Sequence, residues 1–333
     1  MDGSNCLPPE RDAHMTPGVS PFRDAVTEAV QAIPSAASAW GRGWCAAVAS
    51  ILEAAAAKPG NVHPRACFVD LSFGDLVAAG CAIALPIERA TNRPLGETIL
   101  AAVRAAAAAT PSNANLGIIL LVAPVAAVPG AADALRPDTI DAVLERLDEA
   151  DAAAIWNAFQ VARPGGLGRA NRHDLSGPPP PSIRDAMRLA ADRDTIARLW
   201  AHGFQPLFDG PVANLAADID AGVALETAII RAHVRQLARE PDSLIARRHG
   251  ADVAADVSAG AASLVGREQE LGWRDAVDAF DASLRSPCRL NPGTTADLIA
   301  AALYILLRDG RLRPALHRAF HETAFHVPQH EPP

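Results

Sequence analysis

The sequence predicts an all-α fold, a single multi-helix globular domain whose alanine-rich helices pack closely. Half of the 333 residues are apolar, alanine is the most abundant of them, and aromatic residues make up only 5%. Alanine is the best helix former and offers little surface for pairing in a sheet. A chain of this length can also bury a sizeable core. Composition and length therefore both favour a bundle of close-packed helices.

The chain is expected to divide into a core domain and two short ends. Residues 1–20 are rich in proline, glycine and charge, which predicts a loose N-terminal arm. Residues 21–326 form the predicted helical domain, and residues 327–333 a disordered tail. Apolar spacing and helix-breaking prolines mark its helical segments, which are 21–57 with a break near Pro34, 71–89, 95–110, the buried run 116–128, 137–162, 182–200, 222–239 and 298–307.

Charge and cysteine content narrow the classes of function. The net charge is −8 and the pI is near 5.7, which argues against a nucleic-acid or anionic-membrane surface. Five scattered cysteines predict buried thiols in a reducing compartment. The N-terminus lacks the pattern of a signal peptide, and the run 116–128 is too short to span a bilayer. We expect a soluble cytoplasmic protein, with a homo-oligomer among the arrangements compatible with the sequence.

The most informative stretch is Ile51–Asp70, which contains Lys58, the only lysine of the chain. An ammonium is a compact charge with three donors, so a site built for it does not accept a planar guanidinium. Glu53 precedes it on an alanine-rich helix that Pro59 and Gly60 end. One lysine surviving by chance is the alternative. The functional interpretation is a rigid site made by a carboxylate, an ammonium and two polar side chains that follow, Asn61 and His63.

Two further stretches place amides and acids near predicted helix starts. Asn113 and Asn115 lie in the turn before the buried run, where asparagine is typical of caps and turns, or where its amides hold sugar hydroxyls or phosphate oxygens. Asp70 has the residue type of a helix cap. Asp194 lies with other aspartates on the predicted helix 182–200, which is more often a solvated face than a metal site.

Charged residues also interrupt the apolar stripe of segment 222–239. Glu226 and His233 lie on that stripe, and Arg231 flanks it. A buried charge without a partner is costly, so these residues need partners or a function. Segment 164–168, rich in glycine and followed by arginines, is a weaker phosphate candidate because no strand precedes it.

The last candidate stretch precedes the apolar helix 298–307. Thr294 and Asp297 have the spacing of a capping box, and the same helix start could bind a phosphate together with Asn291. His317, His321 and His326 follow at near-helical spacing. Both a metal site and an exposed tail fit these histidines.

Taken together, these motifs resemble the triphosphoribosyl-dephospho-CoA synthases over residues 50–307. Glu53 with Lys58-Pro-Gly is similar to the first family motif, and Asn113-Ala-Asn-Leu-Gly to the second. Asn291-Pro-Gly-Thr with Ala296-Asp-Leu is similar to the last. Lys58-Pro-Gly-Asn-Val-His and the segment 225–233 resemble the branch found in archaea and methylotrophic bacteria, rather than the lyase-linked members.

The resemblance implies an ATP-dependent transferase of prosthetic-group biosynthesis. In the implied reaction, the 2′-hydroxyl of 3′-dephospho-CoA attacks the anomeric carbon of the ATP ribose, and adenine leaves. Three alternatives remain: phosphoribosyl transfer to another alcohol in methanopterin-type one-carbon cofactor synthesis, an ATP-dependent kinase or ligase, and a helical scaffold without chemistry. Release of free adenine distinguishes ribosyl transfer from a kinase or ligase, because a kinase or ligase releases ADP or AMP.

Positive charge on the ribose in the transition state requires a carboxylate, which also takes the proton of the hydroxyl. Glu53 is the first candidate for this base and Glu226 the second. Mg²⁺ is expected to bridge phosphate oxygens and aspartates, with Asp70, Asp194 and Asp297 as candidates. The remaining candidate residues for binding substrate and phosphate are Lys58, Asn61, His63, Asn113, Asn115, Arg231, His233, Arg247, Asn291 and Thr294.

Overall fold

The computed structural model describes residues 40–111, 115–130, 135–163, 177–286, 288–316 and 318. The predicted arm and tail, the first helix expected within 21–57, Asn113, segment 164–168 and the three C-terminal histidines lie outside these residues.

The predicted all-α fold is confirmed. No β-strand occurs in the described parts of the chain, whose extended pairing is limited to two isolated bridges, His63 with Ala66 and Phe68 with Leu71. The helices are α2 (Arg42–Ala55), α3 (Phe73–Ala82), α4 (Ala84–Glu88), η1 (Ala90–Asn92), α5 (Leu95–Ala109), α6 (Leu116–Ala127), α7 (Pro137–Leu144), α8 (Glu149–Ala162), α9 (Ile183–Ala190), α10 (Thr195–His202), α11 (Gln205–Leu207), η3 (Phe208–Val212), α12 (Ala213–Asp220), α13 (Leu225–Arg239), α14 (Ser243–His249), α15 (Ala251–Ala262), α16 (Trp273–Arg285) and α17 (Gly293–Arg308).

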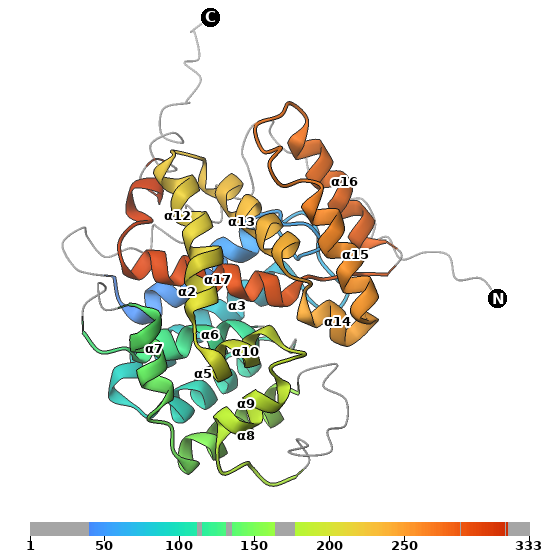
Figure 1. The fold of residues 1–333 in the computed structure, drawn as a ribbon. Helices are drawn as coiled ribbons and strands as arrows, with labels where there is room; N and C mark the ends of the chain where they lie inside the picture. Colours follow the sequence, from blue (N-terminus) through green and yellow to red (C-terminus); the bar gives the residue numbers. More distant parts are fainter. Residues whose placement is uncertain are drawn as a thin grey trace, which may run out of the picture.

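The core is organised around α17, which crosses the middle of the molecule (Figure 1). Its residues from Leu298 to Leu307 are all at most 5% exposed, and a helix that is apolar all round is a buried one. α2, α6, α13 and η3 pack directly against it. α5 and α7–α10 lie on one side of this centre, and α14–α16 on the other (Figure 1). Residues from both sides can therefore reach the start of α17.

The second central helix, α6, contains a proline whose cost the fold offsets. Pro124 has no N–H, so the carbonyl of Leu120 loses its partner within the helix. The indole N–H of Trp200 on α10 donates to that carbonyl over 2.9 Å. Trp200 is completely buried, so the same contact satisfies its only polar group. This bond fixes α10 against α6.

The structure corrects several expected helix boundaries. The expected helix 182–200 is two helices, because Asp194 caps a new start by accepting the Ala197 N–H at 2.9 Å. Segment 137–162 is likewise divided, with Asp148 capping α8. Segment 71–89 divides into α3 and α4 at Ile83. Each side-chain cap satisfies orphan N–H groups, so a short polar residue can start a second helix within one periodic pattern.

The prediction that Asp70 caps the helix after it is wrong. Ser72 is the N-cap of α3 and accepts the Asp75 N–H, while the Asp75 carboxylate accepts from Ser72 in a capping box. Asp70 is exposed and forms an ion pair with Arg289. Asp70 lies two positions too early to be the cap, because only Ser72 has its side chain where the first turn of α3 needs an acceptor.

None of the described helices is both long enough and apolar enough to cross a membrane.

Candidate active site

The break after α2 buries the lysine. Lys58 is fully buried, and its Nζ lies 2.8 Å from the carboxylate of Glu53. Nζ also donates to the main-chain carbonyl of Glu53 and, over 3.2 Å, to that of Ala56. Carbonyls at the end of a helix lack an amide partner in the next turn. Lys58 therefore closes the end of α2 and holds the Glu53 carboxylate, whose residue is only 4% exposed.

The turn after Lys58 is fastened to the segment that precedes α17. Gly60 has φ +74°, and a Cβ there would lie 2.7 Å from the carbonyl oxygen of Leu290, so only glycine fits. The Nδ2 of Asn61 donates to Oδ1 of Asn291 over 2.6 Å. Two predicted stretches from opposite ends of the domain thus come into contact.

An ion pair on α16 holds the same turn. The Gly60 N–H donates to Asp281 at 2.7 Å, and Asp281 pairs with Arg285 at 2.7 Å. Arg285 in turn donates to the carbonyl of Asn61. Sequence reasoning missed both residues, whose only signal was an acid and a base four residues apart on a helix.

His63 lies beside the ion pair of Asp281 and Arg285 as a neutral imidazole. Burial lowers its pKa to about 4, and the positive charge of Arg285 acts in the same direction. Its Nδ1 accepts the N–H of Arg65 over 3.3 Å. At neutral pH His63 can therefore offer a substrate a neutral hydrogen bond and no positive charge.

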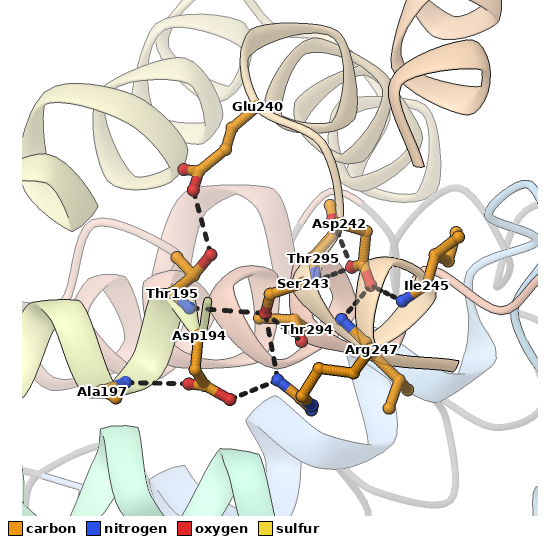
Figure 2. Close-up of polar contacts among 11 residues, drawn as sticks. Asp194, Thr195, Ala197, Glu240, Asp242, Ser243, Ile245, Arg247, Thr294 and Thr295 are labelled. Atoms are coloured by element: carbon orange, nitrogen blue, oxygen red, sulfur yellow. Dashed lines mark hydrogen bonds and ion pairs between the residues drawn. The ribbon is translucent and has the colours of Figure 1, made fainter. Parts of the chain in front are cut away.

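The start of α17 is satisfied by a carboxylate from another helix. Asp242, only 2% exposed, caps α14 and accepts both the N–H and the hydroxyl of Thr295, at 2.7 and 2.8 Å (Figure 2). The expected capping box of Thr294 and Asp297 is wrong, because α17 already begins at Gly293 and has no side-chain cap of its own. Burial raises the pKa of Asp242, and its hydrogen bonds from Thr295 oppose that shift.

Figure 2 shows how the neighbouring side chains extend this junction to α10. Thr294 accepts from Ser243 at 3.0 Å. Arg247 on α14 pairs with Asp194, the cap of α10, and donates to Ser243 at 3.4 Å. Sequence reasoning did not select Asp242 or Ser243, although an acid before a helical segment is a recognisable cap signal.

Asp297 projects from α17 towards the start of α6. A Cβ on Gly117 would lie 1.9 Å from its Oδ2, so the second and third motifs touch here and Gly117 cannot carry a side chain. Burial is the main cause that raises the pKa of Asp297 well above its usual value, and the negative charge of Glu53 is the next. Asp242 and Asp194 add to the same effect, and Arg247 opposes it.

Asn115 stands at the entrance of α6 with an unused amide. It is 7% exposed, has a left-handed φ of +70°, and makes no capping bond to its own helix. Neither its Oδ1 nor its Nδ2 has a hydrogen-bond partner in the described structure. Unpaired buried amides and strained backbone at a non-glycine residue both gather at functional sites.

His233 lies against the other side of the lysine. It is completely buried, and both ring nitrogens lack a partner in hydrogen-bonding geometry among the described residues. Its pKa is lowered well below the usual value, mainly by burial and next by the charge of Lys58, while the carbonyl of Pro59 acts in the opposite direction. His233 is therefore neutral.

The structure places Arg231 in a different network. Arg231 donates to the carbonyl of Glu268 at 2.8 Å and faces Asp218 at 3.7 Å. Arg235 pairs with the same two residues, at 2.8 Å to Asp218 and 3.0 Å to Glu268. These bonds join α12, α13 and the loop before α16 and engage both terminal nitrogens of Arg231 inside the protein, while its Nε has no partner among the described residues.

Two more candidates lie apart from the cluster around Asp297. Asp70 is paired with Arg289 on the surface and is absent from the charges that act on Asp297. Glu226 is half-buried in the first turn of α13, about 10 Å along the helix from His233. Among the described residues, no group of three histidine, cysteine, aspartate or glutamate side chains is arranged to hold a metal ion.

Fold and site together define a class. An all-helical protein that brings together, near one helix junction, a buried ion-paired glutamate, a carboxylate of raised pKa and a buried amide without a partner among the described residues has the features of an enzyme. The family model described as ATP:dephospho-CoA triphosphoribosyl transferase matches residues 39–314. The chain belongs to this family, and it is a transferase of the triphosphoribosyl-dephospho-CoA synthase type that moves a triphosphoribosyl group from ATP to dephospho-CoA.

The fold is also similar to a solved structure. A chain titled as a putative triphosphoribosyl-dephospho-CoA synthase from Archaeoglobus fulgidus superposes with a TM-score of 0.56 at 21% identity, over 70% of this chain and 99% of that one. No curated protein matches the chain. These comparisons give no support to the two alternative activities, a one-carbon cofactor pathway and a kinase or ligase.

Proposed function

We propose that the chain transfers the 5-triphosphoribosyl group of ATP to the 2′-hydroxyl of 3′-dephospho-CoA, with Glu53 as the general base. The observation that supports this most is the buried Glu53 carboxylate, which Lys58 holds within electrostatic reach of Asp297. Family membership supplies the substrates. The geometry of these described residues supports Glu53 as the base.

In this reaction the C1′–O bond forms and the C1′–N bond to adenine breaks. Glu53 removes the proton of the attacking hydroxyl, and the electron pair of the broken bond leaves with adenine. Adenine takes up one proton and Glu53 then gives its own up, so that overall the hydroxyl proton ends on adenine. The sugar carries positive charge in the transition state, which nearby carboxylates stabilise electrostatically. An acidic cluster at this junction suits that charge.

The triphosphate needs donors, and the geometry favours Arg247 and Asn115 among the candidates. Arg247 is next to the cluster, and its Nε has no hydrogen-bond partner in the described chain. Asn115 offers its amide and the uncapped N–H groups of α6. The start of α17 is a poorer place for a phosphate, because the Asp242 carboxylate already occupies it. Asn61 and Asn291 order the surrounding turns through the hydrogen bond between them, and Thr294 does so by accepting from Ser243.

Mg²⁺ would arrive with the triphosphate. This ion keeps several waters and typically binds one or two carboxylates plus substrate phosphates, so it does not need a complete protein cage. Asp297 forms no ion pair or hydrogen bond with any described residue and lies among other carboxylates, so a cation beside it relieves repulsion. Asp297 is the candidate that fits best, since Asp194 already caps α10 and pairs with Arg247. Bound there, Mg²⁺ would neutralise triphosphate charge.

The test is chromatographic detection of free adenine from Mg-ATP with dephospho-CoA. We expect adenine only when both substrates are present, and a loss of at least about a hundredfold in kcat for Glu53→Gln. Glu226→Gln is the matched comparison, since it removes the second candidate base. Adenine release lost in Glu226→Gln and kept in Glu53→Gln would transfer the role to Glu226. Release of ADP or AMP instead of adenine would refute the ribosyl transfer.

The compartment and assembly of the protein are also open to test. We place the reaction in the cytoplasm, which supplies ATP and keeps thiols reduced. The four described cysteines are free, although the expectation that they are buried holds only for Cys45, because Cys67, Cys81 and Cys288 are exposed. Cell fractionation checks this placement. A homo-oligomer stays a prediction, which light scattering at several protein concentrations can measure.

A further inference from the structure

The unique lysine has no proton left for a substrate. An ammonium offers three donors. The Nζ of Lys58 makes three contacts inside the protein, with the Glu53 carboxylate, the Glu53 carbonyl and the Ala56 carbonyl. Its side chain is 0% exposed. A phosphate could reach this ammonium only after the end of α2 had come apart.

These contacts constrain the glutamate. Without Lys58, the helix would fix only the main chain of Glu53, and its carboxylate would be free to rotate. Lys58 bonds the carboxylate and the carbonyl of the same residue, so side chain and backbone are held by one cation. A cation at a helix C-terminus is also favoured by the helix dipole.

The surroundings explain why the cation is a lysine. Lys58 is enclosed, with His233 beside it, itself 0% exposed and neutral. A guanidinium is planar and larger, and its five donors point in fixed directions. It could not bond two adjacent carbonyls and a carboxylate from within the same enclosed space.

We infer that Lys58 is the positioning residue of Glu53, which it holds through a buried ion pair, and that it does not bind the triphosphate. The inference rests on the proposed role of Glu53 as base. It replaces the sequence-based expectation of a phosphate ligand with a role one contact further from the substrate.

The first test uses the intact protein and its single lysine. We expect an amine-reactive ester to label Lys58 at least about a hundredfold more slowly in the native protein than in denaturant, because labelling requires local opening. Mass spectrometry reads the modified peptide, and the N-terminal amine serves as an exposed reference. Adding Mg-ATP should leave the native rate unchanged. Fast native labelling that ATP suppresses would overturn the inference, whatever the outcome for adenine release.

The second test separates positioning from phosphate binding by kinetics. For Lys58→Met we expect kcat to fall as far as in Glu53→Gln, with the KM for ATP within about threefold of the native value. Lys58→Arg should not restore kcat. The double variant Glu53→Gln/Lys58→Met should be no slower than the worse single variant, since both act through one group. A raised KM with an unchanged kcat, or rescue by Lys58→Arg, would contradict positioning.

A thermal cycle covers variants that fold poorly. Removing one partner of a buried pair leaves the other charge unpaired, so the double variant should melt at a higher temperature than the two single losses predict. The surface pair Arg188 with Asp185 is the matched control, with side chains 50% and 62% exposed. Arg188→Met and Asp185→Asn should show additive shifts. Additive shifts at Lys58 and Glu53 as well would count against a coupled pair.

Discussion

Two clusters of buried or half-buried charge differ in their balance. The network that joins α12, α13 and the loop before α16 has two arginines and two carboxylates, Arg231, Arg235, Asp218 and Glu268. The junction of α2, α10, α14 and α17 has two cations against four carboxylates, Lys58, Arg247, Glu53, Asp194, Asp242 and Asp297. Balanced charges stabilise a fold, whereas an excess of one sign raises a pKa and leaves a position for a charged ligand.

The largest expected effect comes from removing one of the excess carboxylates at the junction of α2, α10, α14 and α17. Asp297→Asn should lower adenine release about a hundredfold, because the carboxylate beside the sugar and metal is lost. In EDTA the same variant should be more stable by about 1 kcal/mol, since one of several like charges is gone. Denaturant unfolding and the adenine assay measure the two effects. A variant that is destabilised, and whose lower activity follows from its smaller folded fraction, would mean that Asp297 serves the fold.

Breaking the balanced network should have the reverse profile. Arg231→Met removes the hydrogen bond to the Glu268 carbonyl and the longer of the two ion pairs of Asp218, and should cost about 1–3 kcal/mol in unfolding free energy. Adenine release per folded molecule should stay near the native level. If the variant is stable and its KM for ATP rises instead, Arg231 binds phosphate as the sequence predicted, and the distinction between the clusters is lost.

The pH dependence of stability should sharpen the comparison. The pKa of His63 is lowered from 6.5 to about 4 in the folded state, so the unfolded chain binds the proton more tightly. The contribution of neutral His63 to the free energy of unfolding is fully present above pH 6.5 and is lost as the pH falls towards 4, by about 3 kcal/mol in total. His63→Gln should flatten this acid limb in urea unfolding at several pH values. An unchanged slope would remove His63 from the buried groups that titrate.

The smallest effect is expected at Asn115. Asn115→Gly removes the unpaired amide and relieves the positive φ, so stability should change by less than about 1 kcal/mol. The KM for ATP should rise about tenfold if the amide binds the substrate. Asn115→Ala, which keeps the strain, is the comparison that isolates the backbone term. A KM unchanged in both variants would leave the amide without a role.

The fold could be predicted because its cause is local. Alanine content and apolar period predicted α2, α5, α6 and α13 close to the places where they lie, whereas α12 and α14–α16 fall in parts of the chain where no helix was expected. The boundaries that failed, such as the break at Asp194 and the start of α17 at Gly293, depend on a single cap or on a partner helix. Such a decision is not contained in the periodicity.

The site was predictable only where its parts are close in the chain. Glu53 and Lys58 are five residues apart, so their contact follows from the helix break. The bond between Asn61 and Asn291 and the carboxylate of Asp242 at α17 arise from packing between distant segments. Arg231 shows the converse, because its stripe on α13 could not reveal that Asp218 faces it.

The cap that Asp242 provides for α17 couples the formation of α17 to the docking of α14. The first turn of the central helix lacks a partner of its own until α14 has docked, so neither element gains its full stability alone. Opening of the short helix α14 would release the Thr295 N–H and loosen the turn that bears Asp297. Amide hydrogens at the start of α17 should therefore exchange together with those of α14, and faster than those at its middle.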